Sequence, residues 1–180
     1  MIYMFLADGF EEIEALCPLD LLLRAEVEIK TVSVMGNLIV NGAHNIKVIA
    51  DTLIEELDPA VLPEMVILPG GRNGAFKLDA HEKVKKYILG THERNGYIAA
   101  ICAAPLVLGN LGLLKGKNAV CYPGFESYLT GAVISEEKVV RDGNIITGKG
   151  MGVSQQFGLK LIETLKNADT ANKIKESIMA

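Results

Sequence analysis

Cys102 is the residue in this sequence best placed to act as a nucleophile. It follows the apolar run Tyr97–Ile101, and Ala103-Ala104-Pro105 come directly after it. A strand that turns sharply into a helix needs residues without bulk at the turn, an arrangement called a nucleophile elbow. Because N–H groups at a helix start lower the pKa of a nearby thiol, the pattern predicts a thiolate near neutral pH. The alternative is a buried structural cysteine.

Glu14 is the candidate acid for this cysteine. Glu11, Glu12 and Glu14 follow the first apolar run and occupy the first turn of a predicted helix. Acidic residues stabilise helix N-termini, which explains Glu11 and Glu12 without a catalytic role. Glu14 differs, because Pro18 lies four residues later and cannot donate a hydrogen bond to the Glu14 carbonyl. The loosened turn makes Glu14 a candidate for a functional role, and a third helix-dipole acid is the alternative.

Two glycine-rich segments follow predicted strands. Residues 69–74 read PGGRNG and can present successive N–H groups to an oxyanion, although a simple turn explains them equally well. Residues 148–152 read GKGMG and lack the glycine spacing of a dinucleotide-binding loop. We interpret the second segment as a close-packed turn.

The chain has few other bases or metal ligands. His81 and His92 lie in a charged helical segment and are predicted to be solvated, whereas His44 lies in a predicted hairpin. Cys17 falls on an apolar helix face and is expected in the core, and Cys121 is ambiguous. No Cys and His spacing resembles a metal site, so the sequence predicts no metal and no other cofactor.

The elements that must position these residues alternate along the chain. Apolar runs predict strands over 2–7, 27–34, 38–40, 46–49, 65–68, 97–101, 139–141 and 145–147, and amphipathic segments predict helices over 11–25, 79–94, 103–108, 155–165 and 171–179. This alternation predicts an α/β fold with a mostly parallel sheet covered by helices on both faces. Ligands bind outside the carboxyl ends of such strands. Cys102, Glu14 and the glycine-rich segments all lie there.

Length and composition exclude several classes of protein. The 180 residues carry a net charge of −4, with 49% hydrophobic and 22% charged residues, which fits a single domain over 1–180. Nucleic-acid binding would require a basic surface that is not evident. No apolar run is long enough for a membrane helix. Three cysteines and no recognisable leader predict a cytoplasmic protein with free thiols.

Four motifs resemble the ThiJ/PfpI family, in its DJ-one-like branch. They are GFEEIEA at Gly9–Ala15, ILPGG at Ile67–Gly71, AAICAAP at Ala99–Pro105 and GKGMGVS at Gly148–Ser154. Their order and spacing cover nearly the whole chain. The resemblance implies a flavodoxin-like (Rossmann-like) three-layer sandwich with a nucleophile elbow, and a homodimer.

The resemblance also implies roles for the candidate site. Cys102 would be the reactive cysteine and Glu14 its hydrogen-bonding acid, protonated so that it stabilises the thiolate. The N–H groups of Gly71 and Ala103, with Gly70 beside them, would form the oxyanion site.

Two positions depart from the family pattern. Tyr122 stands where many relatives have a histidine just before a proline, and Ala103 stands where protease-like relatives have a histidine after the cysteine. Both departures make a peptidase less favoured. In the family's dimer a residue from the partner's hairpin approaches the site, and His44 has that place here, acting in trans. Tyr122 and Met151 are expected to line the pocket.

The function implied is that of a cysteine-dependent, stress-protective enzyme. Its substrates would be small dicarbonyls such as methylglyoxal and glyoxal, or their adducts on protein side chains, in a glyoxalase or deglycase reaction. The alternative is a redox-sensing or chaperone-like protein that uses oxidation of Cys102 without turnover.

Overall fold

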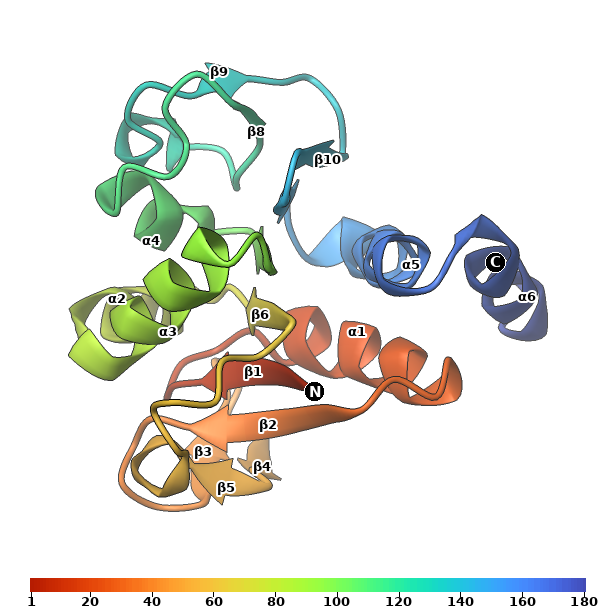
Figure 1. Cartoon of the computed structure of the whole chain (residues 1–180). Coiled ribbons are helices and arrows are strands. Elements are labelled where there is room, and N and C mark those ends of the chain that lie inside the picture. Colours follow the sequence, from red (N-terminus) through yellow and green to blue (C-terminus); the bar gives the residue numbers. More distant parts are fainter.

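The computed structural model describes all 180 residues, Met1–Ala180, and is built around a seven-stranded sheet (Figure 1). The strand order is β10-β11-β7-β6-β1-β2-β5, and all neighbours are parallel except the edge pair β10 and β11. The strands of this sheet are β1 (Ile2–Leu6), β2 (Ile29–Ser33), β5 (Thr52–Leu53), β6 (Met65–Leu68), β7 (Tyr97–Ile101), β10 (Val139–Asp142) and β11 (Ile145–Gly148).

Two small sheets complete the strands. An antiparallel hairpin pairs β3 (Ile39–Asn41) with β4 (Lys47–Ile49), as the sequence predicts, and β8 (Asn118–Ala119) pairs in parallel with β9 (Val133–Ile134). The helices are α1 (Glu12–Arg24), α2 (Arg72–Ala80), α3 (Glu82–Glu93), α4 (Pro105–Asn110), α5 (Ser154–Leu165) and α6 (Ala168–Ser177). Short 3₁₀ turns, η1 (Ile54–Glu56), η2 (Glu126–Tyr128) and η3 (Met151–Val153), lie between them. None of these helices combines the length and the apolar character that a membrane crossing requires.

The side chains of the central strands alternate between two cores, because successive residues of a strand face opposite sides. Tyr3 and Phe5 of β1 join the core under α2, α3 and α4, whereas Met4 and Leu6 join the core under α1, α5 and α6. Figure 1 shows these two groups of helices on opposite sides of the sheet. The sheet is therefore buried on both faces, and the predicted flavodoxin-like three-layer fold is confirmed.

Residues 72–93 form two helices: the helix expected over 79–94 corresponds to α3, which begins three residues later at Glu82, and α2 is a helix that the sequence pattern does not predict. His81 separates them with an extended backbone, and Asp79 belongs to the last turn of α2 rather than capping α3. The sequence pattern does not reveal the start of α2, because the glycine-rich residues 69–74 are typical of a loop. Gly74 is needed for packing rather than for a turn, since a Cβ there would lie 2.8 Å from the Phe10 nitrogen.

The buried face of α1 also differs from the expectation. Ile13 and Leu23 are 48% and 55% exposed, although the apolar pattern predicts that they face inward. The buried positions of the helix are Glu12, Glu14, Ala15, Pro18, Leu21 and Leu22. Two acids thus share the buried side of α1 with apolar residues, whereas Ile13 and Leu23 face outward.

Candidate active site

Cys102 occupies a strained turn directly after β7. Its φ of +64° lies in the left-handed region, which is uncommon for a residue with a Cβ and costs on the order of 1–3 kcal/mol. The Cys102 N–H donates to the Gly148 carbonyl at 2.9 Å, and the Cys102 carbonyl accepts from the Tyr122 N–H at 2.8 Å. These two hydrogen bonds hold the turn on both sides, so the backbone has the geometry of the expected nucleophile elbow.

Two N–H groups converge on the Cys102 sulfur. The Gly71 and Ala103 amides interact with it and lower the pKa of the thiol. Neither amide donates to a backbone carbonyl, so both remain available to a developing negative charge on a ligand. Gly71 has a φ of +86°, which favours glycine, and a Cβ there would lie 2.6 Å from the Glu11 nitrogen.

Gly70 has a different position from the one expected in the oxyanion site. Its N–H interacts with the Glu14 carboxyl rather than with the sulfur. Its Cα lies close to both side chains, since a Cβ there would clash with Glu14 Oε2 and lie 2.5 Å from the Cys102 Cβ. Gly70 therefore serves by leaving space for Cys102 and Glu14 to meet.

Glu14 is 1% exposed and points its Oε2 into the protein beside Cys102. That oxygen has no hydrogen-bond partner of ordinary geometry. Burial raises the pKa of Glu14 to about 7, and the charge of Glu11 adds to the rise, against the lowering effect of the Cys102 thiol and the Gly70 and Met151 amides. A carboxyl in these surroundings can be protonated or ionised near neutral pH.

The Cys102 thiol behaves differently from the sequence prediction of a lowered pKa. Burial, the charge of Glu14 and a hydrogen bond to it raise the pKa of Cys102 to about 12, outweighing the Gly71 and Ala103 amides. Above pH 7 the pair therefore keeps one proton and carries one negative charge. When the proton lies on Glu14, the neutral carboxyl can donate a hydrogen bond to the Cys102 thiolate. The two groups therefore share one proton.

Tyr122 and Met151 lie at the edge of this pair. A Cβ at Gly150 would lie 3.2 Å from Tyr122 Cδ2 and 3.7 Å from Glu14 Oε1, so the ring and the carboxyl flank the same glycine. The Met151 N–H interacts with the Glu14 carboxyl. Tyr122 and Met151 are each 51% exposed. The segment 148–152, interpreted from the sequence as a close-packed turn, thus borders the site as well.

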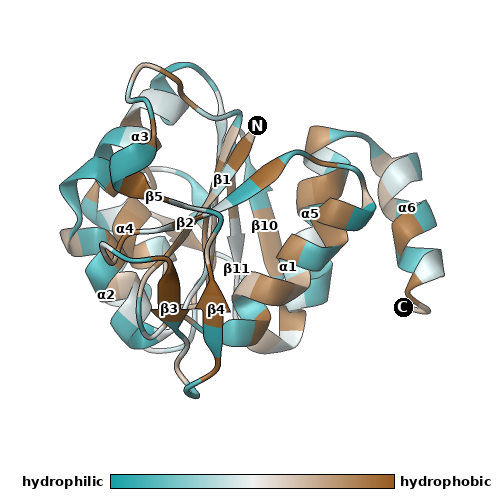
Figure 2. Ribbon diagram, turned by 90° about the horizontal axis from the view of Figure 1, so that it is seen from below, coloured by the Kyte–Doolittle hydropathy of each residue, from teal (hydrophilic) through white to brown (hydrophobic).

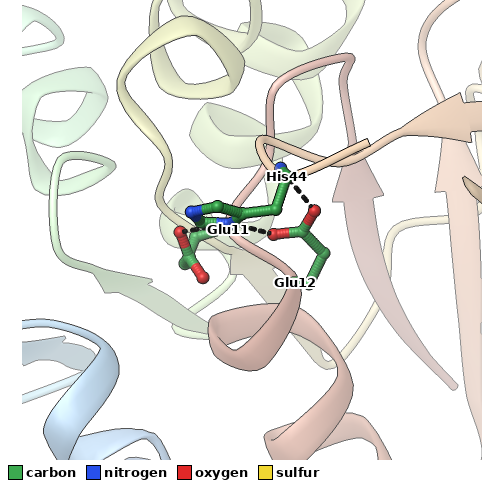
Figure 3. A group of neighbouring side chains, drawn as sticks. All are labelled: Glu11, Glu12 and His44. Atoms are coloured by element: carbon green, nitrogen blue, oxygen red, sulfur yellow. Dashed lines mark hydrogen bonds and ion pairs between the residues drawn. The ribbon is translucent and has the colours of Figure 1, made fainter. Parts of the chain in front are cut away.

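His44 contacts two acids of its own chain (Figure 3). Its N–H donates to Glu12 Oε1 at 2.7 Å, its Nδ1 lies 2.8 Å from Glu12 Oε2, and Glu11 Oε2 lies 3.7 Å from Nδ1. Burial raises the pKa of Glu12, but the hydrogen bonds from His44 outweigh it and the net shift is downward. Glu12 therefore binds the hairpin through His44, in addition to lying in the first turn of α1 as expected of a helix-dipole acid.

Backbone hydrogen bonds join the same hairpin to the start of α1. The Gly9 N–H donates to the Asn41 carbonyl at 2.7 Å, and the Ala43 N–H donates to the Phe10 carbonyl at 2.8 Å. Asp8 Oδ1 accepts from the Asn41 N–H at 2.8 Å. The hairpin thus braces the segment that leads into Glu14. The expected action of His44 across a dimer contact stays a prediction.

Glu11, Glu12 and His44 have the donor types of a metal site, and their ligand atoms lie within 4.8 Å of one another. Both Glu12 oxygens, however, already accept hydrogen bonds from His44. The ion pair accounts for the burial of Glu12 without a cation. We therefore assign the cluster to bracing of the hairpin.

The other histidines and cysteines lie apart from this pair. His92 is half-buried and its Nδ1 lies 3.1 Å from Asn144 Nδ2, and His81 is also half-buried, so the prediction that both are solvated is wrong. Cys17 is half-buried at the edge of the core under α1, and Cys121 is buried.

The sequence could have pointed to Gly148 and Gly150 as site residues, because they lie just after a predicted strand. Nothing in the pattern around Glu12 signals its contact with residue 44.

The fold and the site together define a class: an α/β protein with a cysteine on a strained turn after a central strand, beside a buried acid. A sequence model of the DJ-1/PfpI family matches residues 1–164. The chain belongs to this family.

Relatives agree with this assignment. The chain is 31% identical to the Parkinson disease protein 7 homolog of Danio rerio, over 98% of this chain and 95% of that one. It is 30% identical to the glutathione-independent glyoxalase DJ-1 of Schizosaccharomyces pombe, over 97% and 96%. It is 37% identical to protein DJ-1 homolog B of Arabidopsis thaliana over 88% of its length, but spans only 36% of that longer protein.

Solved structures share the fold. A mutant of a DJ-1 superfamily protein from Salmonella typhimurium has a TM-score of 0.94 and 33% identity, covering 99% of this chain and 97% of that one. An oxidized DJ-1 from Toxoplasma gondii has a TM-score of 0.95 and 33% identity, with the same coverage. The family relationship supports a DJ-1-like, stress-protective function.

Proposed function

We propose that this chain is a cysteine-dependent enzyme that converts small dicarbonyls, with methylglyoxal and glyoxal as the reference substrates. The observation that carries the proposal is the meeting of three features: the strained Cys102, the free amides of Gly71 and Ala103, and the buried, titratable Glu14. The Schizosaccharomyces pombe relative named as a glutathione-independent glyoxalase supports this assignment.

The geometry suggests a sequence of balanced steps. The Cys102 thiolate attacks the aldehyde carbon, and the Gly71 and Ala103 amides hold the resulting oxyanion. Glu14 moves the proton of that carbon to the neighbouring carbonyl carbon, which turns the adduct into a thioester of a 2-hydroxy acid. Water then hydrolyses the thioester and releases the cysteine. The oxidation of one carbon and the reduction of its neighbour cancel, so no cofactor is consumed.

Adducts of dicarbonyls on protein amines or thiols are the second form of the same substrate class. The half-exposed rim at Tyr122 and Met151 is compatible with a substrate that is attached to a larger molecule. A deglycase would release the unmodified side chain and the same 2-hydroxy acid.

Multiple turnover tests the proposal. Purified protein should consume methylglyoxal in large excess over enzyme, and the Cys102→Ser variant should lose at least about a hundredfold in rate, since oxygen is a poorer nucleophile at neutral pH. Cys17→Ser provides the matched control, because that thiol lies at the edge of the core. If the wild type consumes methylglyoxal no faster than the Cys102→Ser variant does, the proposed enzymatic function is contradicted.

A redox sensor or holdase-type stress protein is the second candidate, favoured by one observation. The buried Glu14 Oε2 without a partner could donate a hydrogen bond to an oxidised sulfur of Cys102. Stoichiometric oxidation of Cys102 by peroxide without dicarbonyl turnover would favour this candidate over the enzyme.

We further infer that two copies associate through the outer face of α1 and the β3–β4 hairpin. Ile13 on α1 is 48% exposed, and the hairpin exposes Ile39, Ile46 and Ile49 by 49%, 54% and 73%. Figure 2 shows the hydrophobic residues of β3 and β4 on a hairpin that projects from the sheet. Exposed apolar residues gathered in this way mark interaction surfaces.

A further inference from the structure

The rim of the site offers an aromatic ring, from Tyr122, and a thioether, from Met151, each on a residue that is 51% exposed. We propose that Tyr122 and Met151 bind an apolar or aromatic substituent of the substrate, so that the chain prefers aryl dicarbonyls to methyl ones. This inference rests on the proposed function, because it names the substrate class that reacts at Cys102.

The Tyr122 ring is fixed relative to the reactive pair. The Tyr122 N–H donates to the Cys102 carbonyl at 2.8 Å, which ties the residue to the elbow. The ring edge then lies against Gly150, and the Glu14 carboxyl lies near the same glycine. A side chain larger than hydrogen at Gly150 would displace the ring. Even so, 51% of Tyr122 is exposed, so a large part of its surface is open to a ligand.

Met151 extends the same rim. It follows Gly150 directly, is 51% exposed, and its N–H interacts with the Glu14 carboxyl. A thioether is flexible and makes favourable contacts with aromatic rings. The charged neighbour in this segment, Lys149, donates to the Glu136 carbonyl at 2.9 Å. An exposed, partly aromatic surface, with the Lys149 ammonium held at the Glu136 carbonyl, therefore lies beside Glu14.

The chemistry of a dicarbonyl makes this placement useful. Once the aldehyde carbon is bonded to Cys102 and its oxygen lies at the Gly71 and Ala103 amides, the substituent on the second carbonyl is the part left to extend toward the rim. A methyl group gains little from a ring, whereas a phenyl group can stack on it or meet its edge. An aromatic contact of ordinary strength corresponds to about threefold to tenfold in kcat/KM.

The test compares phenylglyoxal with methylglyoxal as substrates, measured as the ratio of their kcat/KM values. We expect the wild type to favour phenylglyoxal, and Tyr122→Ala to lower this ratio about threefold to tenfold. Tyr122→Phe keeps the ring and should keep the ratio. An unchanged ratio in Tyr122→Ala, or an equal loss in Tyr122→Phe, would overturn the inference.

A second readout separates this inference from the proposed function. Alkylation of Cys102 by iodoacetamide and by its N-benzyl derivative, followed by mass spectrometry, needs no turnover. If labelling prefers the benzyl reagent, if Tyr122→Ala abolishes that preference and if neither dicarbonyl is turned over, the binding of aromatic groups at Tyr122 would be supported and the proposed enzymatic function refuted. Turnover of both dicarbonyls without any aryl preference would refute the binding of aromatic groups at Tyr122 and Met151, but it would support the proposed enzymatic function.

Discussion

At the scale of single residues, the neighbours of Cys102 set the pKa of its thiol. The left-handed turn brings the sulfur beside two free amides and a buried acid, and the acid and thiol compete for one proton. The charge of Glu14 keeps the thiol protonated, whereas the neutral form of Glu14 favours the thiolate. In the proposed reaction, the position of that proton would therefore decide whether Cys102 is a thiolate.

Labelling of Cys102 against pH measures this sharing. Below pH 7 both groups hold their protons, and the first proton leaves as the pH rises through the Glu14 pKa of about 7. We expect the iodoacetamide labelling rate to rise in a step with its midpoint near pH 7. Glu14→Gln should abolish the step, because an amide does not titrate, and should lower dicarbonyl turnover about a hundredfold. A step that persists in Glu14→Gln would assign the titration to another group.

Gly70 is the residue whose smallest substitution should disable the site. A Cβ there would lie 2.8 Å from the Ile101 carbonyl oxygen and overlap Glu14 and Cys102. Gly70→Ala should reduce Cys102 labelling and turnover about a hundredfold by separating the pair. Gly152→Ala is the matched control, since a Cβ at Gly152 meets nothing within 4 Å. Circular dichroism should show a folded protein, and full activity in folded Gly70→Ala would disprove the role.

At the scale of elements, the site depends on four chain segments that end at one edge of the sheet. β7 leads into Cys102, β6 leads into Gly70 and Gly71, and β11 leads into Gly150. The segment after β1 leads into Glu14 and is braced by the β3–β4 hairpin through backbone bonds and His44. The hairpin begins at Ile39, 25 residues after Glu14 in sequence, yet it helps to fix the start of α1.

The brace should depend on pH. The interaction with Glu12 raises the pKa of His44, with the charge of Glu11 adding to it, so the stabilisation is complete below the unfolded value and is lost as the pH rises through the folded one. We expect His44→Ala to lower Tm more at pH 6 than at pH 8.5. Lys47→Ala, an exposed cation of the same hairpin, should lower it little at either pH. Equal losses at both values would contradict the ion pair.

Association of two copies is the question at the scale of the whole molecule. Ile49 is 73% exposed on the hairpin, and a charge placed there would be buried without a partner in the proposed contact. Ile49→Glu should shift the sedimenting species from dimer to the 19.4 kDa monomer. Val133→Glu, an exposed change on β9, should leave the dimer intact. A wild type that sediments as a monomer at micromolar concentration would exclude the association.

Mixing experiments test whether His44 acts across that contact. If it does, inactive Cys102→Ala and partly inactive His44→Ala subunits should regain activity when mixed, because each hybrid dimer holds one complete site. If His44 acts only by bracing its own chain at Glu12, mixing should restore no activity beyond the average of the two variants. The 2.8 Å contact within one chain favours the second result.

The sequence by itself determined the alternating fold, the elbow cysteine, the acid at Glu14 and the family. These features depend on residues that are neighbours in sequence, so apolar periodicity and small residues at strand ends are enough to predict them. Only the tertiary structure decided which acid holds His44, which face of α1 is buried, and that residues 72–80 form a helix. It also decided the protonation of the Cys102–Glu14 pair, because burial and the approach of a second charge arise only when distant segments pack together.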